Sequence, residues 1–330
     1  MQRGRLVTIF GMLLVCLPGL VGCGGGARAS STAPDVHQGQ PLTYRPRLPL
    51  RVHVANAGRE GSLRLERITY TSVDGQRVPA LFAVPTDNPP LGCLMYQGGL
   101  GQTKEELPQL RRGAAKLRLA TFTIDPRHGG ARGSAAQMVA ALKTPETLRA
   151  MVLDTVVDLR IGLDYLESRP ECRRNIAYLG TSFGGVVGAV FGGQDPRLRA
   201  VALTSIGATF EAAMLVGSAA AQRIPDLPVQ VPGAATDPAI LAHAVSILGP
   251  YDPAKWVAKI APRPLMLING RFDPLVVPGD ALELAAAAND PKSLLYFNGG
   301  HDPFAAGPDQ QWVAVQLAQF LAGNLGLPGL

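Results

Sequence analysis

Apolar residues gather in short runs that recur along the chain from residue 63 onward. Residues 63–72 and 77–85 flank Asp74-Gly75, a dipeptide typical of hairpin turns, and predict two antiparallel strands. Near-continuous apolar runs, typical of strands buried on both faces of a sheet, follow at 91–97, 119–125, 176–181, 200–205, 264–269 and 293–298. Helical spacing of apolar residues occurs at 104–117, 146–167, from 183 onward and at 308–322. A hairpin followed by alternating strands and helices predicts an α/β fold with a mostly parallel central sheet flanked by helices.

One long segment, residues 207 to about 260, interrupts this alternation. An apolar helical stretch at 210–223 is followed by the proline-rich residues 224–238 and a second helical piece. Insertions of this length are often functional, so the segment predicts either a cap insertion over a site or a packed insertion without that role.

The N-terminus has the pattern of an export signal. Arg3 and Arg5 precede an apolar run, residues 6–20, that is too short for a comfortable membrane span. The run ends in Leu20-Val21-Gly22-Cys23, which resembles a bacterial lipobox. The resemblance implies cleavage before Cys23 and lipidation of its sulfur; the alternative is an ordinary secretory signal with a chance cysteine. Several acyl chains would anchor the protein stably to a membrane, so we expect an exported, membrane-anchored lipoprotein on the periplasmic or outer face.

The domain organisation follows from these boundaries. Residues 1–22 are predicted to be a lipoprotein signal peptide. Residues 23–50 are rich in glycine, serine and proline and are predicted to be a lipidated flexible tether. Residues 51–330 are predicted to form one α/β domain that contains the cap insertion.

Charge and cysteine content add two expectations. The formal net charge is +6, of which Arg3 and Arg5 contribute two, and no long basic run is present, so nucleic-acid binding is not expected. After loss of the signal and lipidation, Cys93 and Cys172 remain. Cys172 lies several residues before its strand, an offset that looks too large for a disulfide with Cys93. We therefore expect two free thiols.

The strongest chemical motif is Gly-Thr-Ser-Phe-Gly-Gly at residues 180–185, between a predicted strand and a predicted helix. A serine on such a sharp strand-to-helix turn has an exposed hydroxyl and needs small neighbours. Ser182 is therefore the predicted nucleophile. The amide of Phe183, at the start of the helix, points to the place where an oxyanion would form.

A serine nucleophile needs a base. Five histidines are present: His37, His53, His128, His243 and His301. His301 follows the last strand and a Gly-Gly pair, so it is the predicted base. His128, in an Arg-His-Gly-Gly loop after another strand, is the rival, and its alternative role is a loop residue at the rim of the site.

A carboxylate must orient the base. Asp273 lies four residues beyond the strand at 264–269 and is the predicted acid, because Ser, Asp, His is the chain order of this type of site. Asp280 and Asp302 are alternatives. Asp280 is otherwise expected to cap the next helix, and Asp302 to be a turn residue.

The second oxyanion donor is expected in the glycine-rich turn at 97–101, where the backbone can approach a substrate closely. We predict the amide of Gly99; the alternative is a tight turn only. No cluster of side chains has metal-ligand spacing, and neither a metal nor an organic cofactor is expected.

With these motifs in place, residues 60 to the end resemble the α/β-hydrolase superfamily. Within it, the chain is similar to the group of dienelactone hydrolases, acetyl xylan esterases and prolyl-oligopeptidase-like proteins. Tyr251-Asp252-Pro253, the segment 260–265 and Asp273 are similar to the stretch that leads to the catalytic acid of that group. The resemblance implies Ser182, Asp273 and His301 as the triad. One departure is Gln97-Gly98, where the group often has His-Gly.

The predicted function is hydrolysis of a small-molecule carboxylic ester through an acyl-enzyme intermediate. Two alternatives remain: a peptidase or amidase acting on short peptides with the same machinery, and a non-catalytic lipoprotein that binds a partner at the cell surface. The complete Ser-Asp-His set argues against the latter.

Overall fold

The computed structural model describes residues 51–307 and 309–328. The predicted signal peptide, the lipidation site Cys23 and the tether at 23–50 lie outside the described residues. In the part of the chain that is described, no helix combines the length and the apolar character needed to cross a membrane.

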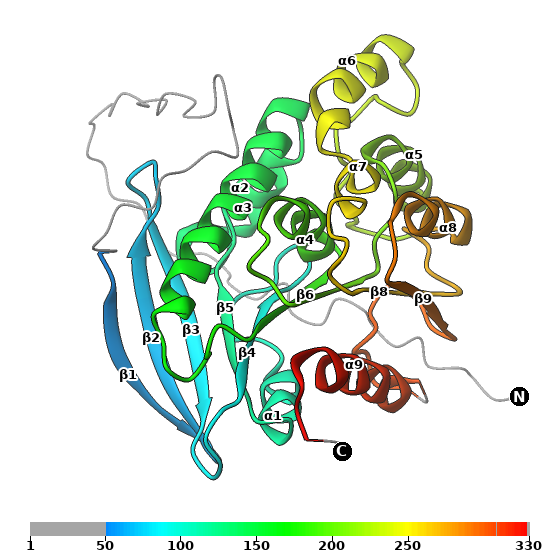
Figure 1. The fold of residues 1–330 in the computed structure, drawn as a ribbon. Coiled ribbons are helices and arrows are strands. Elements are labelled where there is room, and N and C mark those ends of the chain that lie inside the picture. Colours follow the sequence, from blue (N-terminus) through cyan, green and yellow to red (C-terminus); the bar gives the residue numbers. More distant parts are fainter. Residues whose placement is uncertain (1–50, 308, 329–330) are drawn as a thin grey trace, which may run out of the picture. The chain divides into compact units, whose positions relative to one another are not determined.

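Nine strands form one sheet in the order β1-β2-β3-β5-β4-β6-β7-β8-β9 (Figure 1). The strands are β1 (His53–Glu60), β2 (Leu63–Thr71), β3 (Arg77–Pro85), β4 (Gly92–Gln97), β5 (Leu119–Ile124), β6 (Ile176–Thr181), β7 (Ala200–Thr204), β8 (Leu265–Gly270) and β9 (Lys292–Phe297). The first three strands and β5 pair antiparallel, and all pairs from β5 through β4 to β9 are parallel. The predicted fold class is therefore confirmed.

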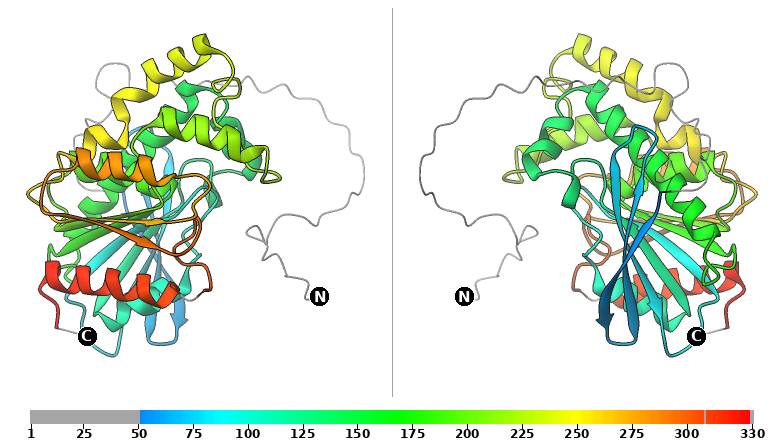
Figure 2. Two further views of the ribbon diagram at one scale, coloured as in Figure 1. Left: turned by 90° about the vertical axis from the view of Figure 1, so that its right-hand side faces the viewer. Right: turned by 90° about the vertical axis from the view of Figure 1, so that its left-hand side faces the viewer.

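Helices cover both faces of this sheet (Figures 1 and 2). Helices α1 (Pro108–Lys116) and α9 (Gln310–Leu325) lie on one face, over a core that includes Leu94, Leu179 and Leu317. The other face carries α2 (Ala135–Ala141), α3 (Pro145–Glu167), α4 (Phe183–Gln194), α5 (Phe210–Ala221), α6 (Pro238–Leu248), α7 (Pro253–Val257) and α8 (Pro278–Ala287). The apolar strands are buried because both of their faces are covered.

The sequence pattern misses β1, the edge strand. Every residue of His53–Glu60 is exposed or only partly buried, and the strand pairs with β2 alone. An edge strand without a buried face has no apolar alternation to reveal it.

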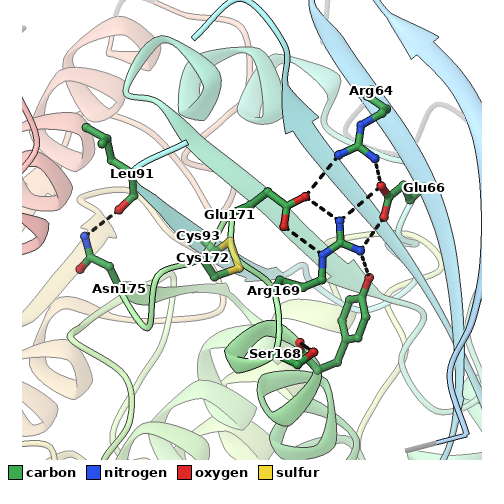
Figure 3. Close-up of a disulfide and its surroundings, with 10 residues drawn as sticks. Arg64, Glu66, Leu91, Cys93, Ser168, Arg169, Glu171, Cys172 and Asn175 are labelled. Atoms are coloured by element: carbon green, nitrogen blue, oxygen red, sulfur yellow. Dashed lines mark hydrogen bonds and ion pairs between the residues drawn. A yellow bond between two sulfur atoms is a disulfide. The ribbon is translucent and has the colours of Figure 1, made fainter. Parts of the chain in front are cut away.

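The expectation of two free thiols is wrong, because Cys93 and Cys172 form a disulfide with their Cα atoms 4.8 Å apart (Figure 3). Cys93 on β4 pairs in register with Ile176, four residues beyond Cys172, an offset of about 13 Å for an extended chain. The chain is not extended there. The Asn175 amide donates to the Cys172 carbonyl at 2.7 Å, and this turn folds Cys172 back over the start of β4.

Candidate active site

The nucleophile turn lies between β6 and α4. Ser182 has φ 54° and ψ −115°, a backbone conformation that is unusual for a residue other than glycine. A Cβ atom at Gly180 would lie 2.2 Å from the Gly184 carbonyl oxygen, and one at Gly184 would lie 1.9 Å from that of Gln97. The turn can therefore close only with glycine on both sides, the physical requirement that the motif implies.

Three side chains from three strand ends meet at this turn. The Ser182 hydroxyl lies 2.8 Å from His301 Nε2, and His301 Nδ1 lies 2.8 Å from Asp273 Oδ2. An ionised carboxylate only accepts hydrogen bonds, so the proton on Nδ1 is donated to Asp273, which leaves Nε2 as acceptor for the Ser182 hydroxyl. The arrangement gives the serine a base in the tautomer that can remove its proton.

Asp273 is held in place by its own turn. Its side chain is buried, and Oδ1 accepts from the Leu275 and Val276 amides at 2.8 and 3.0 Å. Asp302 accepts from the Phe304 amide, as expected of a turn residue.

Asp280 does not cap its own helix, contrary to expectation. Val277 is at the N-cap of α8, whereas Asp280 accepts from the Ala208 amide at 2.8 Å, beyond β7. Burial raises the pKa of Asp280, and the neighbouring Glu283 acts in the same direction. Asp252 makes the matching bond to the Phe210 amide at 2.9 Å, so two carboxylates hold the start of α5.

His128, the rival base, lies in a loop fixed by buried ion pairs. Its neighbour Arg127 donates to Asp158 at 2.9 and 3.1 Å, and Arg132 donates to the same carboxylate at 2.6 Å. Burial, and then the charges of Arg127 and Arg132, lower the pKa of His128. The imidazole that contacts Ser182 is that of His301.

The two predicted oxyanion donors have different surroundings. The Phe183 amide is the first of α4, so its N–H has no partner within the helix. Gly99 lies beside the nucleophile, since a Cβ there would be 3.4 Å from Ser182 Cβ. Its amide, however, donates to Gln102 Oε1 at 2.9 Å, so an oxyanion would have to replace or share this bond.

A cavity of about 130 Å³ opens beside Ser182 and His301. Its lining is mostly apolar, and it includes α5 and the proline-rich segment after it, at Phe210, Ala213, Gly217, Leu227, Pro228 and Gln230. Residues of the insertion at 207–260 thus form part of the cavity wall. The Val231 amide donates to the Leu142 carbonyl at 2.8 Å, which attaches the insertion to the end of α2.

Two contributors to the site, Ser205 and Gln102, were missed by the sequence reasoning, and the role of a third was predicted wrongly. Ser205 donates to the His301 carbonyl at 2.6 Å and so supports the loop of the base. Gln102 accepts a hydrogen bond from the Gly99 amide. Asp280, expected as an alternative acid or a helix cap, instead holds the loop after β7. No local motif marks these residues, because their partners belong to other segments or depend on the exact path of a loop. Among the described residues, no group of three or more His, Cys, Asp or Glu side chains could hold a metal ion.

Comparison with known proteins identifies the fold. No protein-family model and no curated protein sequence matches this chain. Among solved structures, it is similar to an acetyl xylan esterase from Paenibacillus sp. R4, with 18% identity, 82% of this chain and 89% of that chain covered, and a TM-score of 0.63.

A second acetyl xylan esterase, from Thermoanaerobacterium sp., shares 13% identity over 82% of this chain and 88% of its own, with a TM-score of 0.63. A Pyrococcus furiosus esterase shares 16% identity over 80% and 94%, with a TM-score of 0.60. Together with the mostly parallel nine-stranded sheet, these likenesses show that the chain has the α/β-hydrolase fold.

Proposed function

We propose that this protein is a serine hydrolase that cleaves carboxylic esters through an acyl-enzyme intermediate. The observation that carries the proposal is the continuous path of hydrogen bonds from Ser182 through His301 to Asp273. The esterases among the structural neighbours agree with it.

The proposed reaction uses the three hydrogen-bonded side chains in turn. His301 Nε2 takes the Ser182 proton while Oγ attacks the acyl carbon, and Asp273 stabilises the imidazolium that forms. The Phe183 amide donates to the oxyanion. The Gly99 amide donates as well, once its hydrogen bond to Gln102 Oε1 has been replaced or shared. His301 then protonates the leaving alkoxide, and a water molecule repeats the sequence to release the acid.

Active-site labelling and mutagenesis test this mechanism. An organophosphonate should label Ser182 covalently, and Ser182→Ala or His301→Ala should lower kcat by a factor of about 10⁶. Asp273→Asn should cost less, about 10⁴, because His301 remains but loses its orientation. His128→Ala is the control. If His128→Ala abolished hydrolysis while folded His301→Ala retained it, the base would be assigned wrongly.

The same groups can cleave amides, so ester hydrolysis needs a direct comparison. Matched p-nitrophenyl esters and p-nitroanilides with the same acyl group separate an esterase from a peptidase or amidase. Absence of both labelling and turnover in folded protein would favour the non-catalytic surface-binding alternative.

We propose further that the protein is exported and anchored to a membrane through lipidated Cys23. The support is the N-terminal pattern ending in Leu20-Val21-Gly22-Cys23 and the disulfide between Cys93 and Cys172. Disulfides persist mainly in oxidising compartments outside the cytosol.

A further inference from the structure

We propose that the enclosed side of the cavity is an acyl pocket for an uncharged chain of up to about six carbons, a size set by comparison with a ~150 Å³ apolar cavity that holds benzene. We propose also that Gly217 on α5 sets the permitted chain length. This inference rests on the proposed esterase function.

The cavity walls come from two sides of Ser182. The sheet places β4 and β5 on one side of β6, and β7, β8 and β9 on the other (Figure 1). His301, Leu275, Val276 and Asp280 belong to the loops and the helix on the β8–β9 side. Leu142, Leu148 and Val152 come from the segment that follows β5.

The position of the base decides which part of an ester lies on which side. His301 must protonate the leaving oxygen, so the alcohol lies on the β8–β9 side. Phe272, next to Asp273 on this side, is 72% exposed. The acyl chain extends from the same carbon in the opposite direction, toward Leu148 and Val152, which are almost completely buried.

The lining selects for an uncharged acyl group. The 22 lining residues include no lysine or arginine, and Asp280 is the one acidic side chain among them. A carboxylate or phosphate on the acyl chain would lose its hydration without finding a cation. The whole cavity, with the alcohol side included, has a volume of about 130 Å³, close to that of the apolar cavity that holds benzene, so about six carbons is the upper limit for the acyl chain.

On the α5 side of the cavity, Gly217 leaves room for a longer acyl chain. Ala213 and Gly217 are four residues apart on α5, so they share one face of the helix, and both line the cavity. A Cβ atom at Gly217 would meet no atom within 4 Å. A leucine there can therefore enter the cavity without striking the backbone, and replacing glycine within a helix does not weaken the helix.

The test measures kcat/KM for p-nitrophenyl acetate, butyrate, hexanoate and octanoate, which share one leaving group. Gly217→Leu should lower the hexanoate-to-acetate ratio by about tenfold or more, the usual effect of removing room for a methylene group. Val152→Ala should raise the octanoate-to-acetate ratio. The control is Gly113→Leu on α1, where an added Cβ also meets nothing within 4 Å and which is not among the residues that line this cavity.

Two further arms separate chain length from charge and from the alcohol. p-Nitrophenyl hemisuccinate should react more slowly than the butyrate ester of equal chain length. Across butyrate esters of methanol, butanol and hexanol, Gly217→Leu should change kcat/KM by one common factor.

The outcomes are distinct. Equal losses for acetate and hexanoate in Gly217→Leu, or a loss that grows with the alcohol instead, would overturn the acyl assignment while leaving the esterase function intact. Rapid hydrolysis of the hemisuccinate would overturn the charge selection. A wild-type protein that cleaves none of the esters would overturn the function and the inference together.

Discussion

The disulfide between Cys93 and Cys172 provides the most direct quantitative prediction. It closes a loop with a sequence separation of 79. In the chain-entropy treatment, a cross-link over a loop of this length stabilises the folded state by about 4.5 kcal/mol, through the entropy it removes from the unfolded chain. At roughly 2 °C per kcal/mol for a domain of this size, Cys93→Ala/Cys172→Ala should lower Tm by roughly 9 °C.

Urea unfolding and thermal melting of the mature domain measure this effect. Either single alanine variant removes the cross-link, so each should lose nearly as much stability as the double variant, and the losses should not add. Both cysteines are fully buried, so reductant should act mainly through the unfolded state. It should shift the wild-type urea midpoint toward that of the double variant and leave the double variant unchanged.

Two results would refute this reasoning. One is a double variant with the urea midpoint of the wild type. The other is recovery of two thiols per chain when unreduced, unfolded protein is titrated.

The remaining predictions concern the anchor and pH. Wild-type protein should partition into the detergent phase, whereas Cys23→Ala should be released or unprocessed; equal partitioning would contradict the anchor. Burial raises the pKa of Asp280 above its ordinary 3.8, so the folded state holds this proton more tightly than the unfolded state, and stability should fall as pH rises between these two pKa values. Asp280→Asn keeps an acceptor for the Ala208 amide but cannot ionise. The unfolding free energy of Asp280→Asn relative to wild type, measured by urea titration, should therefore rise over the same pH interval. Parallel pH profiles of the two proteins would argue against a raised pKa for Asp280 in the folded state.

Local pattern was enough to predict most of the architecture and the three residues that the structure brings together. Apolar runs locate β4 to β8, because a strand buried on both faces must be apolar throughout, and the Asp74-Gly75 turn marks β2 and β3. The turn around Ser182 is recognisable because its close backbone contacts admit only glycine at two nearby positions. Asp273 and His301 were predicted because a parallel sheet brings the ends of its strands to one edge, so strand order and chain order limit the choice.

Contacts that depend on the path of a loop were decided by the tertiary structure alone. Cys172 reaches Cys93 because a turn at 172–175 removes an offset that an extended chain would keep. The Gly99 amide is bonded to Gln102, and Asp280 holds Ala208 instead of capping α8; both depend on where side chains meet after folding. The size of the cavity likewise depends on where α5 packs, because Phe210, Ala213 and Gly217 of this helix line it. The sequence alone shows which residues pack inward, because the apolar pattern of each segment can be read without the others. The bonding partners named here depend on distances between segments, and these distances are fixed only when the segments pack together.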